Sequence, residues 1–258
     1  MRHVPRKRFG QNFLVDEAAI AAVVAAIAPQ RHDRLVEIGP GLGALTRPLS
    51  ERLEHLHAIE LDRDIVARLR AELPARRVTL HEGDALRFDF STLGPRLRVV
   101  GNLPYNISTP LLFHLAQHAA AIFDIHVMLQ KEVVERMVAA PSDSEYSRLS
   151  VMLQYRFELE WLLDVPAAAF QPEPKVESAV VRLTPFARLP HPARDETVFA
   201  KIVAAAFSQR RKTLRNALQA HFNTADFERL GVNSGLRAQD LPVADFVRLA
   251  NSTGALPR

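Results

Sequence analysis

The stretch LVEIGPGLG, residues 35–43, decides the fold of this chain. Its first four residues are typical of a buried strand. The three glycines that follow permit a tight turn with the backbone close to a ligand, and residues 44–52 have the pattern of a helix. Strand, glycine turn and helix together indicate the start of an open α/β sheet. Alone this signal is weak, because with Ala44 it also satisfies a loose dinucleotide-binding pattern.

Three further strands are predicted, and each ends in residues that can bind a polar ligand. Residues 56–59 lead into Glu60, residues 78–81 into Asp84, and residues 97–100 into Asn-Leu-Pro-Tyr at 102–105. Each acid alone is more often a solvated loop residue. The carboxyl ends of parallel strands share one rim, however, so we expect the glycine turn, both acids and the Asn-Leu-Pro-Tyr loop to converge there. Glu60 could then accept ribose hydroxyls, and Asp84 an adenine amino group.

The loop at 102–105 carries the most distinctive chemistry. Pro104 fixes its own φ and keeps Leu103 out of the helical region, so carbonyls here lack helical partners. The amide oxygen of Asn102, a carbonyl and the ring of Tyr105 suit a planar base with an exocyclic amine. The alternative is a strand-to-helix turn with a buried tyrosine, and the tetrapeptide alone does not separate the two.

The charges around the glycine turn favour one kind of ligand. A dinucleotide site must hold a pyrophosphate, yet this rim has acids and no Lys or Arg near the turn. It therefore suits a neutral or cationic adenosine derivative. S-adenosylmethionine, with its sulfonium and ammonium groups, is such a molecule.

Composition indicates a globular protein with a polyanionic partner. The 258 residues carry a net charge of +4 and predict one to two domains. Residues 1–15 and 208–215 hold four cations each and no acid, which leaves 4 − 8 = −4 for the rest. Such clusters suggest nucleic acid, although charge runs are usually solvated surface. The absence of Cys excludes disulfides and Cys-based metal sites and fits the cytosol.

The remaining segments complete a two-part chain. Residues 16–28 have the apolar stripe of an amphipathic helix and are too short to span a bilayer, so we predict no targeting or membrane segment. His114 and His118, on a helix at 110–120, could form a metal pair, but no third ligand of fitting spacing is evident and we predict no metal. Further strands are expected at 125–129, 157–163 and 178–183, and further helices at 131–139 and 147–154. The strand at 178–183 should be antiparallel, because the preceding connection is too short for a crossover helix. Prolines at 185, 190 and 192 mark a linker to a helical remainder.

Phe170 opens the proline-stiffened loop FQPEPKV, residues 170–176. It is either an apolar anchor for this loop or a second ring that faces Tyr105. Sequence spacing alone slightly favours the anchor.

Together these residues resemble the ribosomal RNA adenine N6-dimethyltransferase family, and most closely its bacterial small-subunit branch. The resemblance covers nearly the whole chain, beginning with RKRFGQNFL at 6–14. Its motifs are specific, and they are found at 37–46, 101–109, 128–132, 170–178 and 206–216.

The resemblance implies a Rossmann-like α/β fold of S-adenosylmethionine-dependent methyltransferases, with a seven-stranded mixed sheet whose last strand pair is antiparallel. It implies a methyltransferase domain at 1–188 and a small α-helical, RNA-binding domain at 189–258. The implied cofactor contacts are Asn12, Leu14, Gly39, Gly41, Glu60, Asp84 and Asn102. The target adenine would be held by Asn102, Leu103 and Pro104 and stacked between Tyr105 and Phe170. The implied RNA contacts are Arg6, Lys7, Arg8, Arg210, Arg211, Lys212 and Arg215.

The implied reaction is dimethylation of two adjacent adenosines in a hairpin loop near the 3′ end of 16S rRNA, within the small ribosomal subunit. We expect a cytoplasmic monomer with a role in ribosome assembly. Two alternatives remain: a large-subunit adenine methyltransferase of the antibiotic-resistance type, and an assembly factor for which binding is primary and catalysis secondary.

Overall fold

The computed structural model describes residues 12–253. The chain divides by packing into two units. The first contains the residues up to 134 together with 158–185, and the second contains 135–157 together with the residues from 186 onward. Each unit is described by itself. Within the described residues, none of the helices combines the length and apolarity needed to cross a bilayer.

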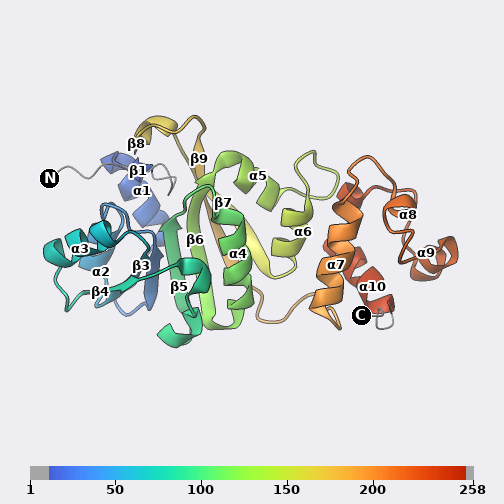
Figure 1. Cartoon of the computed structure of the whole chain (residues 1–258), viewed down its shortest axis with the longest axis horizontal. Coiled ribbons are helices and arrows are strands. Elements are labelled where there is room, and N and C mark those ends of the chain that lie inside the picture. The colour runs from blue at the N-terminus through green and yellow to red at the C-terminus, as the bar shows by residue number, and fades with distance from the viewer. Residues whose placement is uncertain (1–11, 254–258) are drawn as a thin grey trace. The chain divides into compact units, whose positions relative to one another are not determined.

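The first unit is built on a seven-stranded mixed sheet (Figure 1). The strand order is β4-β3-β2-β5-β6-β9-β7. Strands β4 to β6 pair in parallel, and β9 runs antiparallel to β6, as the short connection predicts. The strands are β2 (Leu35–Ile38), β3 (Leu56–Glu60), β4 (Val78–Glu82), β5 (Leu97–Asn102), β6 (Ile122–Gln130), β7 (Phe157–Val165) and β9 (Ser178–Pro185). Every predicted strand is confirmed, and several are longer than predicted by one to four residues.

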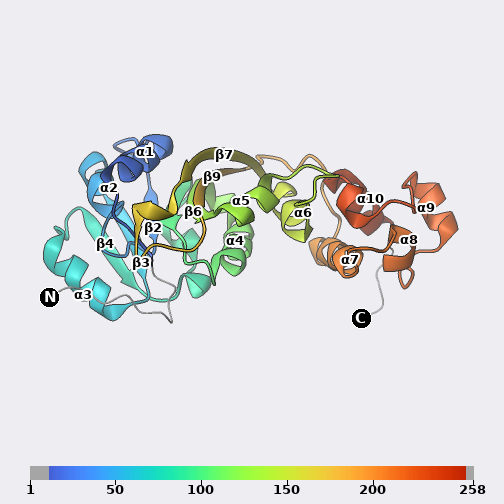
Figure 2. The same ribbon diagram turned by 90° about the horizontal axis from the view of Figure 1, so that it is seen from above.

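Helices flank this sheet, and all except α3 lie where the sequence predicts them. They are α1 (Glu17–Ile27), α2 (Thr46–Arg52), α3 (Arg63–Glu72), α4 (Ser108–Gln117) and α5 (Lys131–Val138). Asp16 caps α1 by accepting a hydrogen bond from Ala19 N at 2.7 Å. Both ribbon views show α2 and α3 beside β3 and β4, and α4 toward β6 (Figures 1 and 2). The connection between β4 and β5 contains two short 3₁₀ turns, η2 (Ala85–Arg87) and η3 (Phe90–Leu93).

A second, two-stranded sheet joins distant parts of the sequence. Strand β1 (Phe13–Leu14) pairs antiparallel with β8 (Phe170–Gln171), and Figure 1 shows the two side by side. Val15 N also donates to Ala169 O at 2.9 Å. Sequence analysis did not predict this pairing. It fixes the segment before α1 against the loop that carries Phe170.

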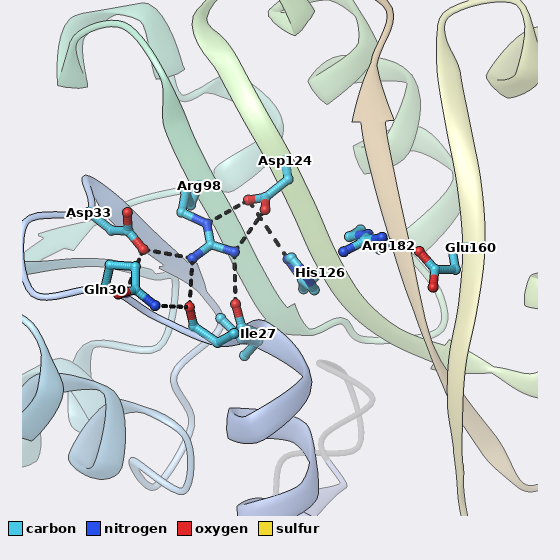
Figure 3. Close-up of polar contacts among 9 residues, drawn as sticks. Ile27, Gln30, Asp33, Arg98, Asp124, His126, Glu160 and Arg182 are labelled. Carbon is cyan, nitrogen blue, oxygen red and sulfur yellow. Dashed lines mark hydrogen bonds and ion pairs between the residues drawn. The ribbon is translucent and has the colours of Figure 1, made fainter.

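A buried arginine holds the end of α1 on the sheet (Figure 3). Arg98, on β5, is 7% exposed and forms a bidentate pair with Asp124 on β6, at 2.8 and 2.9 Å. The Nη1 of Arg98 donates to Asp33 at 2.6 Å, and its Nη2, which also binds Asp124, donates to the carbonyl of Ile27 at 2.8 Å. His126, beside Asp124, is almost fully buried. Because the guanidinium has a partner on each side, its charge is compensated within the fold.

The second unit is helical. Its elements are α6 (Arg148–Gln154), α7 (Glu196–Phe207), α8 (Leu214–Ala217), α9 (Thr224–Leu230), the 3₁₀ turn η6 (Ala238–Asp240) and α10 (Val243–Ser252). Helix α7 packs against α10 (Figure 2). Phe199 and Phe246 from these helices share one apolar cluster with Tyr146, Val151 and Tyr155.

The division of the chain by packing differs from the predicted domain limits, 1–188 and 189–258. Residues 135–157 precede the proline linker, yet they pack with the helical unit. The reason is that Tyr146, Val151 and Tyr155 are buried in the same apolar cluster as Phe199 of α7. The first unit ends at 185, close to the predicted linker.

Candidate active site

A cavity of about 370 Å³ opens at the carboxyl ends of β2 to β5. Its lining includes every residue predicted to contact a cofactor: Asn12, Leu14, Gly39, Gly41, Glu60, Asp84 and Asn102. Leu103, Pro104 and Tyr105 also line it. The structure thus brings the four predicted strand ends together at one rim.

The glycine turn lets the backbone form one wall of this cavity. Gly39 and Gly41 have φ values of 68° and 54°, in the left-handed region that side chains disfavour. A Cβ atom on Gly41 would also lie 3.1 Å from the ring of Phe13. Glycine at 41 therefore leaves room for both the turn and the β1 segment that covers it.

Glu60 is held by backbone N–H groups at the end of β3. Its Oε1 accepts from Asp62 N at 2.8 Å, and its Oε2 lies 3.4 Å from Gly41 N. Burial raises the pKa of Glu60, and these N–H groups lower it only in part, so the net shift is upward. Asp84 is half-buried and accepts from Leu86 N at 2.9 Å, which caps η2. Both carboxyl groups are therefore positioned by their own loops.

The loop after β5 is fixed at both ends. The amide nitrogen of Asn102 donates to Asn12 O at 3.1 Å. This bond fixes the side chain and leaves its amide oxygen as the acceptor for a ligand. Leu103 N donates to Met128 O at 3.1 Å. The hydroxyl of Tyr105 lies 2.9 Å from Ser178 Oγ on β9. The half-buried tyrosine is therefore tied to the sheet by its hydroxyl, and its ring lines the cavity.

Phe170 is placed as the anchor that the sequence slightly favours. It is 4% exposed and packs in an apolar cluster with Leu14, Met128 and Val180. It is not among the residues that line the cavity. Its role as a second stacking ring stays a prediction.

Two residues of the site were missed by sequence reasoning. Glu37, on β2, lines the cavity and is 1% exposed. Burial, together with the nearby charge of Glu60, raises its pKa to about 7. Its signal was visible, since it is an acid within an otherwise apolar strand, LVEI. Ser178, which holds Tyr105, gave no such signal, because a serine at the start of a strand is ordinary.

The predicted RNA contacts form an exposed group in the helical unit. Arg210, Arg211, Lys212 and Arg215 follow α7 and are all exposed. Within residues 12–253 none of the four forms an ion pair, and Arg210 donates to the carbonyl of Ser144 at 2.8 Å. Arg6, Lys7 and Arg8 lie outside the described residues.

The histidine pair does not develop into a metal site in the part of the chain that is described. The rings of His114 and His118 are 4.8 Å apart, and His114 Nε2 lies 2.8 Å from the carbonyl oxygen of Phe88. No group of three potential metal-ligating side chains occurs among residues 12–253. The two rings instead join a row of aromatic contacts with Phe90.

Comparison with known proteins points to the same family as the residues of the site. The family model described as ribosomal RNA adenine dimethylase matches residues 2–254. A ribosomal RNA small subunit methyltransferase A from Thiobacillus denitrificans is 66% identical over 95% of this chain and 96% of its own. One from Nitrosospira multiformis is 60% identical over 97% of each chain.

Solved structures give the same result. A dimethyladenosine transferase from Plasmodium falciparum superposes with a TM-score of 0.73 at 25% identity, covering 92% of this chain and 95% of its own. The 23S rRNA methyltransferase ErmE superposes with a TM-score of 0.72 at 25% identity, covering 93% and 98%. The sequence, the fold and the converging strand ends place this chain in the ribosomal RNA adenine dimethylase family.

Proposed function

We propose that this protein uses S-adenosylmethionine to dimethylate the N6 amines of two adjacent adenosines, in a hairpin loop near the 3′ end of 16S rRNA in the small subunit. The observation that carries the proposal is the loop after β5, where Asn102, fixed by the Asn12 carbonyl, faces the cavity beside Tyr105. The relatives at 56–66% identity are ribosomal RNA small subunit methyltransferases, which supports the small subunit as the source of the RNA.

The charges that line the cavity fit the proposed cofactor. Its charged lining residues are Glu37, Glu60 and Asp84, and no Lys or Arg of the described chain lines it. We assign the ribose to Glu60 and the adenine amino group to Asp84, because carboxylates accept from both. The glycine turn also lines the cavity, and we assign the amino-acid part to it. When bound, this cofactor supplies a methyl group made electrophilic by the sulfonium.

The chain's part in the reaction is to present the amine. The N6 lone pair of adenine is delocalised into the ring, so the amine is a weak nucleophile. We assign one acceptor for its N–H groups to the Asn102 oxygen and a second to the carbonyl of Leu103. Accepting both hydrogens favours a more pyramidal nitrogen, whose lone pair is then available for in-line attack. Catalysis is therefore positioning and electrostatics, and the proton can leave after the transfer.

The base must leave its stack to reach this loop. Stacking on an aromatic ring returns about 1–3 kcal/mol per base, and Tyr105, held by Ser178, supplies that ring. Phe170 would supply the second face only by moving out of its apolar cluster. The exposed cations after α7 are assigned to RNA phosphates, which they contact without reading sequence.

The direct test is methylation of small subunits that lack the modification, with labelled cofactor, followed by mass-spectrometric mapping of the RNA. We expect dimethyladenosine at two adjacent positions in wild-type reactions. Asn102→Ala should abolish turnover and leave subunit binding largely intact. Unmodified RNA after incubation with the wild-type protein would overturn the proposal.

The large-subunit alternative rests on the similarity to ErmE. It predicts methylation of naked large-subunit RNA. The small-subunit assignment is favoured, because small-subunit relatives match at 56–66% identity, whereas ErmE matches at 25%. Assaying both substrates with one preparation separates the two activities.

The binding-factor alternative rests on the exposed cations of the helical unit. It predicts that a catalytically inactive variant still binds immature subunits, with an affinity that falls steeply as salt rises. Arg211→Ala and Arg215→Ala should weaken this binding and reduce its salt slope. An unchanged slope would show that this surface does not contact RNA. The role is compatible with the enzyme.

A further inference from the structure

A second cavity, of about 680 Å³, opens at the end of the sheet opposite the candidate active site. Its lining comes from residues at or just before the starts of β2, β5 and β6, from the end of α1, and from Arg182 on β9. Strand β5 has six residues, and a strand rises about 3.3 Å per residue, so roughly 20 Å separate the two ends. The proposed methylation therefore leaves this cavity without a role.

Arginines dominate the charge of this cavity. Four of them line it together with two aspartates, which gives 4 − 2 = +2 with the histidines neutral. Arg98 is buried at its floor and binds both aspartates (Figure 3). Arg182 forms an ion pair with Glu160 on β7. Arg34 and Arg96 are exposed, and neither forms an ion pair with a residue in the described part of the chain. These two arginines are therefore the cations available to a ligand.

The two available arginines border the cavity beside an exposed ring. The guanidinium of Arg96 lies over the ring of Phe123, 4.4 Å from its centre, and Phe123 is still 43% exposed. Arg96 has a φ of 57°, in the left-handed region that favours glycine, so its position over the ring is kept at a cost in backbone strain. Arg34 lies against Gly94, where a Cβ atom would overlap its guanidinium. Both cations and the ring thus belong to one polar cavity.

An exposed ring beside unpaired arginines is typical of a site for single-stranded nucleic acid. Bases stack on aromatic rings and on guanidinium planes, while arginines hold the phosphates next to them. The volume of the cavity is in the range that takes a ligand of the size of a nucleotide. An acidic peptide would pair with the cations but would not need the ring.

We propose that this cavity is a second RNA site, in which one unstacked nucleotide places its base on the Phe123–Arg96 stack and its flanking phosphates on Arg34 and Arg96. The inference rests on the proposed function, because the RNA that it names is small-subunit RNA beyond the target loop. The second contact makes binding of the substrate bivalent. It therefore lowers the KM for the small subunit and leaves kcat to the loop after β5.

The test uses the full-length protein and a six-nucleotide oligouridylate with 4-thiouridine at its centre, which cross-links to adjacent side chains under long-wave light. This probe lacks the N6 amine that the loop after β5 is assigned to hold. Mass spectrometry of the digest should find the probe on the peptide that contains Phe123. The yield of this cross-link, titrated against probe concentration, gives the affinity of this cavity alone.

A pair of substitutions removes the phosphate contacts. Arg34→Ser with Arg96→Gly takes away both cations, and glycine adopts the φ at 96 without strain. Each phosphate contact with a single strand contributes about 0.7 to the slope of log affinity against log salt, so the slope should fall by about 1.4 and the affinity at 0.1 M salt about 25-fold. The matched control, Arg52→Ser with Arg76→Ser, removes two exposed cations that do not line the cavity. Because salt screens distant charges, this control should change the affinity less than about threefold.

A third variant separates the base from the phosphates. Phe123→Leu removes the stacking ring at an exposed position and keeps every charge. The KM for methylation of small subunits should rise at least about fivefold, whereas the salt slope of subunit binding should not change. The two arginine substitutions should raise the same KM and also lower the slope. In both cases kcat should stay within about twofold, because the cavity lies away from the reacting atoms.

The outcomes separate this inference from the proposed function. Cross-links confined to other peptides, or a double variant that loses no more affinity than the control pair, would overturn the inference and leave the proposed function in place. Uridine monophosphate that competes as well as the hexamer would assign the cavity to a free nucleotide. Oligoglutamate that competes as well would assign it to an acidic protein, and either result also overturns the inference. If the wild-type protein does not methylate small subunits, the proposed function is wrong, whereas a cross-link at Phe123 with the expected salt dependence still supports the RNA site.

Discussion

The hydrogen bond between Tyr105 and Ser178 should be what holds the tyrosine ring in place for a target base. The two oxygens are 2.9 Å apart, and Ser178 is fully buried. Tyr105→Phe and Ser178→Ala each remove this bond, which should lower the free energy of unfolding by about 0.5–1.5 kcal/mol. The double variant should cost no more than either single one, which corresponds to a coupling energy of about 1 kcal/mol.

The same coupling between the two single variants and the double variant should be found in the rate of methylation. If about 1 kcal/mol of ring positioning is lost in the transition state, single-turnover methylation should slow about fivefold. Cofactor affinity should change little, because Ser178 does not line the cavity. Tyr155→Phe is the matched control, since its hydroxyl donates to Glu196 at 3.2 Å in the helical unit: stability should fall and the methylation rate should not. Urea unfolding and rapid-quench assays give both numbers. Rate effects of the two single variants that simply add in the double variant would refute the reasoning.

Three further outcomes test the frame around the site. Gly101→Ala would place a Cβ atom 2.5 Å from a carbonyl oxygen of β2, so urea unfolding should show a loss of about 1–3 kcal/mol. Gly83→Ala, whose Cβ meets nothing within 4 Å, should stay within about 0.5 kcal/mol. Arg98→Leu leaves two aspartates without their partner and should cost about 3–5 kcal/mol, whereas Arg31→Leu, from an exposed pair, should cost at most about 1 kcal/mol. Burial lowers the pKa of His126 from 6.5 to about 4, so the unfolded state binds more protons in that window. Stability should fall by about 3 kcal/mol as pH drops from 6.5 to 4, and a His126→Asn variant that keeps this pH dependence in urea titrations would show another group to be responsible.

The convergence of the predicted residues on one cavity could be predicted because they lie at the ends of strands. Each strand is an apolar run with a clear limit, and the parallel order brings Glu60, Asp84 and Asn102 to one rim. The local sequence was therefore enough to predict which residues meet at this rim. Glu37 was not predicted, because an acid within an apolar strand only interrupts the local pattern. Whether its side chain is buried depends on the segments that cover the sheet, which the local pattern does not show.

The parts that were not predicted depend on contacts between distant segments. Strands β1 and β8 have two residues each, too few for any periodicity to register. The placement of Phe170 follows from that pairing. Residues 135–157 read as helices of the first domain, but the side chains that bury Tyr146 and Tyr155 come from beyond the linker. No local pattern contains that information.

The pairing of Leu14 with Phe170 also has a consequence for synthesis of the chain. One wall of the cavity comes from residues 12–14, but their partner strand is complete only when residue 171 has been made. Translation adds about 5–20 residues per second, so the early segment must wait roughly ten seconds or more for its partner. A nascent chain that ends before residue 171 cannot close the cavity. The proposed enzyme of the ribosome would thus gain its cofactor site only after residue 171 has left the ribosome that makes it.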